Sequence, residues 1–85
     1  MTTRGTVHAI NPLRGMVAIS TPSNGFTIIE LLGSNEVEIG DVVSWQNDTG
    51  RGSEIYRNET RGETLDVHVQ NHAVSAAALR QRLLL

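Results

Sequence analysis

The sequence predicts a small all-β barrel of five to six strands, followed by a short C-terminal α-helix. The chain has 85 residues, which allows one domain with one modest core. Short apolar runs rich in β-branched residues fill its first two-thirds and stop at turn residues, which is typical of strands. The last segment changes to helix formers without glycine or proline. A β-sandwich usually needs more strands and a longer chain, so these observations favour a barrel.

The first three strands are expected to form an antiparallel meander. Asn11-Pro12 is a turn-initiating pair that ends the first apolar run. Ser23-Asn24-Gly25 predicts a hairpin, because the Asn-Gly pair tolerates the positive φ angles of a tight turn. The three strands are expected over residues 4–10, 15–21 and 26–32.

The second half of the barrel is expected to begin with a polar stretch, residues 33–40, which Val37 and Ile39 anchor to the core. A short extended segment around Ile55 and Tyr56 is expected as an edge strand, after a turn over residues 48–52. Residues 63–70 alternate between apolar and polar side chains, which is the period of a half-buried strand. The remaining strands are therefore expected over residues 41–47, near 55–56, and over 63–70, with Leu65, Val67 and Val69 on the inner face.

The C-terminal helix is expected over residues 74–84, after a barrel that spans residues 3–70 of a single domain, 1–85. A helix of about a dozen residues is marginal alone, so its apolar stripe must be covered. Two surfaces can cover it: an open end of the barrel, which we favour, or the same helix of a second subunit. The apolar run Leu83-Leu84-Leu85 leaves room for self-association of an otherwise monomeric protein.

The first half of the chain resembles a cold-shock domain, a family of oligonucleotide/oligosaccharide-binding (OB) folds. The stretch Gly5-Thr6-Val7, followed by Asn11, Arg14-Gly15 and a second strand ending in Ile19, is similar to the opening of that family. Gly40-Asp41-Val42-Val43-Ser44-Trp45 is similar to the Gly-x-x-Val-x-Phe of the family's fourth strand. The resemblance implies an OB-like barrel.

The resemblance also implies a place for a ligand. Cold-shock domains stack the bases of single strands on aromatic side chains of the second and third strands. These positions fall on Ala9, Met16 and Ala18, which are not aromatic, while Phe26 is a candidate for a surviving third-strand aromatic. Arg14 matches the family's basic residue before the glycine.

A second set of candidate binding residues lies in residues 50–61, the loop that forms one wall of the cleft in OB folds. Arg51 and Arg57 can pair with phosphates, and Tyr56 between them can stack on a base. The alternative, which the even interleaving of charges favours, is that carboxylates neutralise the arginines of this segment. Those carboxylates belong to Glu54, Glu59 and Glu63.

Several classes of protein are disfavoured by composition. There is no cysteine, and the three histidines do not form a helical metal pair, so neither a metal site nor another cofactor is expected. No serine lies in a glycine elbow, so we expect no enzyme. No apolar run is long enough to span a bilayer, and the lack of cysteine fits the cytoplasm.

The sequence thus predicts a non-enzymatic binding module whose ligand is single-stranded RNA or DNA. Its site would consist of Arg14, Phe26, Arg51, Tyr56 and Arg57. The net charge of −2 gives no basic surplus for binding phosphates. The rival hypothesis is therefore a protein-interaction or assembly module, in which Met16, Ala18 and Ile28 or Ile29 form an apolar patch instead of a stacking platform.

Overall fold

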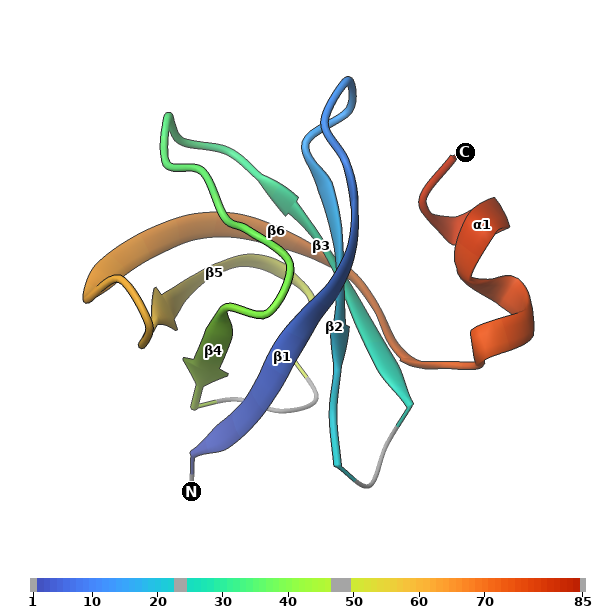
Figure 1. The fold of residues 1–85 in the computed structure, drawn as a ribbon, viewed down its shortest axis with the longest axis horizontal. Helices are drawn as coiled ribbons and strands as arrows, with labels where there is room; N and C mark the ends of the chain where they lie inside the picture. Colours follow the sequence, from blue (N-terminus) through green and yellow to red (C-terminus); the bar gives the residue numbers. More distant parts are fainter. Residues whose placement is uncertain (1, 23–24, 47–49, 85) are drawn as a thin grey trace.

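A computed structural model of the chain describes residues 2–22, 25–46 and 50–84, and it is a closed antiparallel β-barrel (Figure 1). The strand order around the barrel is β1-β2-β3-β6-β5-β4, and β4 pairs with β1 to close it. Two three-stranded meanders, β1–β2–β3 and β4–β5–β6, are thus joined by the β3–β6 and β1–β4 pairings. The expected all-β barrel with a short C-terminal helix is confirmed. The strands are β1 (Thr3–Asn11), β2 (Met16–Ser20), β3 (Phe26–Leu31), β4 (Val42–Trp45), β5 (Gly52–Asn58) and β6 (Glu63–Val74).

Tight turns connect the first meander, as the sequence predicts. The backbone N–H of Thr21 donates to the carbonyl O of Gly25, 2.9 Å away, and closes the β2–β3 hairpin. Ser23 and Asn24 of this turn, Asn47 at the end of the expected fourth strand, and residues 48–49 of the expected turn before β5 lie outside the described residues. Gly5 is required by close packing, since a Cβ there would lie 2.5 Å from Cγ2 of Ile19 and 2.7 Å from the carbonyl O of Ser20.

The barrel interior holds the main hydrophobic core. Strand alternation points one set of side chains inward from every strand. Leu65, Val67 and Val69 of β6 lie in this set, which confirms the period read from residues 63–70. The interior cluster consists of Val7, Val17, Ile19, Ile29, Val37, Val43, Trp45, Tyr56, Leu65, Val67 and Val69.

Two expectations about the second half are wrong. Strand β5 is not an edge strand, because a closed barrel has no edges and β5 pairs with both β4 and β6. Ile39 does not anchor the loop before β4. Val37 is buried, but Ile39 is 68% exposed. The N–H of Asp41 donates to the carbonyl O of Glu38, so Ile39 lies at the outside of a tight turn.

The C-terminal segment, residues 75–84, differs from the expected helix in its bounds and its docking site. Strand β6 continues to Val74, which pairs with Phe26 of β3, so the barrel sheet extends past residue 70. The helical part consists of a 3-10 turn, η1 (Ala76–Ala78), and one α-helical turn, α1 (Leu79–Arg82). It lies against the outside of β1–β2–β3 rather than across an open end of the barrel (Figure 1).

Candidate binding surfaces

The five residues expected to form a ligand site do not share one surface. Arg14 lies in the β1–β2 turn and Phe26 at the β2–β3 turn, at opposite ends of the first meander. Arg51 precedes β5 and Arg57 lies near its end. The three arginines are exposed, Phe26 is half-buried, and Tyr56 is buried.

Tyr56 lies inside the barrel, not in a binding groove. It is 1% exposed and stacks on Trp45, with 4.5 Å between ring centroids and an interplanar angle of 5°. Burial, together with the charge of Glu54, raises the pKa of the Tyr56 hydroxyl well above its usual range. Since its ring presents no face to solvent, Tyr56 cannot stack on a base while the barrel is closed.

Carboxylates pair with two arginines of this region, and Glu59 is the one of the three expected carboxylates that forms such a pair within the described residues. Nε of Arg57 lies 3.8 Å from Oε1 of Glu59. Arg61 contacts Glu38 at 3.1 Å and Asp41 at 3.4 Å, so its partners come from the loop before β4 rather than from its own segment. These pairs lower the positive potential that a phosphate would meet.

Asp41 is the buried centre of that ion-pair network. Burial alone would raise the pKa of its carboxyl, but hydrogen bonds donated by the Glu38 backbone N–H and the Asn58 amide, with the Arg61 guanidinium, lower it overall. The same donors tie the loop before β4 to β5. The network is therefore structural, since its donors are used internally.

The outer face of β1–β2–β3 is apolar and is covered by the chain's own C-terminal segment. We call this the covered face, defined by Ala9, Met16, Ala18 and Ile28. Three of these are the positions where the resembled family stacks bases. Residues of the end of β6 and of the C-terminal segment lie over them, and this second hydrophobic cluster excludes solvent from Ala18 and Ile28 completely. The covering side chains are Val74, Leu83, Ala78 and Leu79.

A buried hydrogen bond fixes the C-terminal segment to the covered face. The side-chain amide of Asn11 donates to the carbonyl O of Leu83 at 2.7 Å. Leu83 itself is 1% exposed, whereas its neighbour Leu84 is 57% exposed. At the margin of this face, the rings of His8 and Phe26 lie 5.0 Å apart at 56°. The apolar patch of the rival hypothesis therefore exists, but this segment occupies it.

A second, smaller apolar patch is exposed on the other side of the barrel. We call it the exposed patch, and it consists of Leu32 and Ile55 with Asp66 between them. Ile55 and Asp66 are register partners, and the N–H of Leu32 donates to the carbonyl O of Asp66 at 2.9 Å. Leu32 is 54% exposed and Ile55 is 61% exposed. Together they line a shallow concavity of about 390 Å³.

Charge is segregated along the chain, a signal in the sequence that the motifs do not reveal. All nine acidic residues lie between Glu30 and Asp66, together with three arginines, which gives this stretch a formal charge of −6. Residues 1–29 and 67–85 have no acidic residue and a formal charge of +4. Arg80 and Arg82 are exposed on the C-terminal segment that lies over the covered face, while Glu30 on β3 is the register partner of Met16 on β2. Arg14 lies in the β1–β2 turn, whereas Arg4 lies on β1 beside β4.

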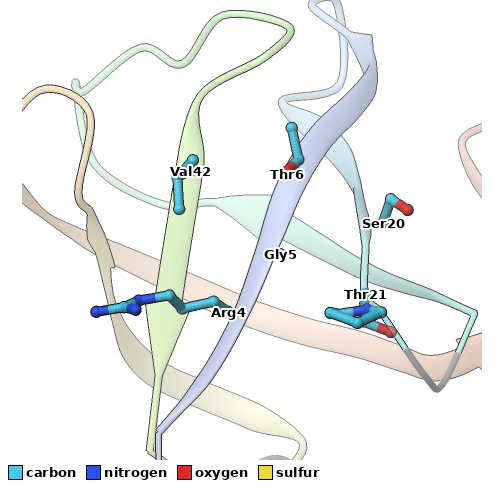
Figure 2. Close-up of a pocket in the computed structure, with 7 residues that line it drawn as sticks. Arg4, Gly5, Thr6, Ser20, Thr21 and Val42 are labelled. Carbon is cyan, nitrogen blue, oxygen red and sulfur yellow. The ribbon is translucent and has the colours of Figure 1, made fainter.

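Two further concavities do not assemble a reactive site from the described residues. One of them, about 630 Å³, lies at one barrel end between the β1–β2 turn and the loop before β4, and Arg61 on its rim is already paired. Figure 2 shows a smaller one around Gly5, where Arg4 extends toward β4 while Ser20 and Thr21 lie on the other side of β1. The polar groups there do not converge on one point.

Histidine and acidic side chains form no metal cluster in the described part of the chain. His72 contacts the hydroxyl of Thr27 at 3.0 Å and the carbonyl O of Gly50 at 2.7 Å. The Nδ1 of His68 contacts the amide of Gln70 at 2.9 Å. His72 therefore links β6 to β3 and to the segment before β5. His68 forms a local side-chain contact within β6.

Comparison with known proteins adds no family assignment. No family model matches the chain, and no curated protein or solved structure is significantly similar to it. Within residues 2–22, 25–46 and 50–84, no helix has the length and apolar character needed to cross a membrane. The class that the fold defines is thus a small closed β-barrel compatible with OB-like folds.

Proposed function

We propose that the protein is a non-enzymatic protein-interaction and assembly module built on an OB-like barrel. The observation that carries this proposal is the covered face. At the positions where the resembled family stacks bases, this chain has small and aliphatic side chains, buried under its own C-terminal segment. A ligand that needed this face would have to displace Leu83 and break its hydrogen bond to Asn11.

The energetics of base stacking favour protein over nucleic acid. Each stacked base contributes about 1–3 kcal/mol, and the covered face offers no aromatic ring at Ala9, Met16 or Ala18. The phosphate contribution is reduced as well, because Arg57 and Arg61 are paired with carboxylates. The exposed patch, by contrast, presents two large aliphatic side chains to solvent, which is typical of protein contacts.

Weak binding of single-stranded RNA or DNA is the second candidate function. The observation that favours it is that Arg14, Arg80 and Arg82 are exposed, and that the two stretches that contain them, residues 1–29 and 67–85, have no acidic residue. Phe26, half-buried beside His8, packs against the cluster on the covered face. Binding of this kind would be electrostatic and would weaken steeply as salt rises.

One pair of measurements separates the two functions. Amide chemical shifts of labelled protein are followed while an oligonucleotide of about ten nucleotides is added in low salt. In parallel, wild type and Ile55→Ser are used to capture partners from a lysate of the native host, in high salt and after nuclease treatment. The protein-interaction function predicts unchanged shifts and a partner that wild type retains and Ile55→Ser loses.

Ile39→Ser is the matched control, because Ile39 is an equally exposed aliphatic residue in a turn outside the exposed patch. It is expected to capture the partner as wild type does. Shift changes at Arg14, Arg80 and Arg82 that disappear with salt, together with no captured partner, would instead establish the nucleic-acid function.

A further inference from the structure

The exposed patch has the geometry of a site for a basic, partly apolar segment. Three adjacent chain segments place Ile55, Asp66 and Leu32 side by side with their side chains outward, because Tyr56 and Val67 point into the barrel. Two aliphatic side chains therefore flank a carboxylate. Within the described residues, that carboxylate has neither an ion pair nor a side-chain hydrogen bond.

The aliphatic stem and the charged end of an arginine or lysine side chain both fit this arrangement. Its aliphatic stem can pack on Leu32 and Ile55 while its charged end pairs with Asp66. Glu54 lines the same concavity and adds negative charge at its rim. The occupant that fits the exposed patch is thus a segment in which arginine or lysine alternates with leucine-like residues.

The chain itself carries such a segment at its C-terminal end. In Leu79–Arg82 and the two residues after it, Leu83 packs on the covered face while Arg80 and Arg82 are exposed and Leu84 is 57% exposed. No acidic residue occurs in residues 67–85. The surface of this segment is therefore basic and partly apolar, complementary to the exposed patch in both charge and apolarity.

We infer that the exposed patch of one copy binds the C-terminal segment of a second copy through Asp66 and the Arg80–Arg82 pair, an inference that rests on the proposed assembly function. The two surfaces cannot meet within one chain, because Leu83 and Asn11 fix the segment over β1–β2–β3. Two different surfaces that bind each other form a head-to-tail contact, which leads to a ring or an open chain of copies. Its strength depends on ionic strength, since the paired charges are exposed.

Sedimentation velocity over a concentration series in low salt tests this inference on the full chain. Wild type is expected to sediment faster as concentration rises, and more slowly in high salt. Asp66→Lys and the double variant Arg80→Glu/Arg82→Glu should each weaken self-association by about tenfold or more, because each places like charges in contact. An equimolar mixture of the two should recover it, because reversed charges on both surfaces are again complementary.

Glu36→Lys is the control, since it makes the same charge change as Asp66→Lys on an exposed residue of the barrel-end loop. It should self-associate as wild type does, and circular dichroism verifies that all variants are folded. Wild type that stays monomeric, or variants that associate unchanged, would overturn the inference. If wild type is monomeric yet captures a host protein that Asp66→Lys does not, the inference that a second copy occupies the exposed patch is wrong. The proposed protein-interaction function then stands. If wild type captures none, the proposed function fails as well.

Discussion

Two apolar patches lie on the outside of the same barrel, and the chain treats them differently. The covered face, on β1–β2–β3, is buried beneath the C-terminal segment and contributes to a second hydrophobic core. The exposed patch, between β3, β5 and β6, leaves Leu32 and Ile55 more than half exposed. An apolar surface thus indicates a binding site for another molecule only when no segment of the same chain covers it. The covered face contributes to stability, whereas the exposed patch is the surface that we propose for a partner.

The largest expected effect is the difference in the free energy of unfolding between a truncation of Ile28 on the covered face and one of Ile55 on the exposed patch. Ile28→Ala should lower the free energy of unfolding by about 2–4 kcal/mol, because Ile28 is 0% exposed and its loss leaves a cavity beneath the C-terminal segment. Ile55→Ala should change it by less than about 0.5 kcal/mol, because its side chain is mostly in water. Urea denaturation of both variants measures the difference. Equal losses would mean that the two patches are buried alike.

The next effect compares two neighbouring leucines of the C-terminal segment. Leu83→Ala should cost about 2–3 kcal/mol, somewhat less than a residue inside the barrel, because a chain end can readjust. Leu84→Ala should be nearly neutral, since Leu84 is 57% exposed. Thermal unfolding followed by circular dichroism provides the check. A neutral Leu83→Ala would show that the segment is undocked.

A smaller loss is expected from the hydrogen bond that fixes the segment. Asn11→Ala should cost about 1–2 kcal/mol, since it leaves the buried carbonyl of Leu83 without its donor. The double variant Asn11→Ala/Leu83→Ala should lose less than the sum of the two single losses, because both changes release the same segment. A double-mutant cycle in urea measures this coupling. Strict additivity would contradict the shared role of the two residues.

The smallest effect concerns Asp41, a buried carboxylate that accepts hydrogen bonds from the Glu38 backbone and the Asn58 side chain. Its pKa is lower in the folded protein than its ordinary value of 3.8. The folded state therefore gains stability from Asp41 at pH values above that ordinary value, and loses this contribution as pH falls through the lowered pKa. Asp41→Asn should flatten the pH dependence of unfolding below about pH 4, relative to Glu36→Gln. An acid limb equally steep in both variants would contradict this assignment.

How far the sequence predicts this fold depends on how clearly each strand alternates. Residues 63–70 have apolar side chains at every second position, so the inner face of β6 follows directly. Around β5 the apolar Ile55 and Tyr56 are adjacent, and only the pairing register decides which one points inward. Tyr56 was expected in a binding site because residues 50–61 were interpreted as the loop that forms one wall of an OB cleft, whereas β5 occupies residues 52–58.

The docking of the C-terminal segment was harder to predict. Its need for cover follows from its length and its leucines, but the choice of surface depends on the path of the chain after β6. Strand β6 continues to Val74 along β3, and this carries the segment to the outer face rather than to a barrel end. The replacement of aromatic residues by Ala9, Met16 and Ala18 was the available signal, since an apolar strand face invites a cover.

The most direct test of the covered face is a methyl NOE measurement on the full chain in solution. We predict cross-peaks from the Leu83 methyl groups to Met16 and Ile28, since all three belong to one buried cluster. The Leu84 methyl groups should show no cross-peak to Ile28, because Leu84 does not belong to this cluster and is mostly exposed. Absence of the Leu83 cross-peaks, with solvent-exposed Met16 and Ile28, would contradict the account. It would return the outer face of β1–β2–β3 to the set of available binding surfaces.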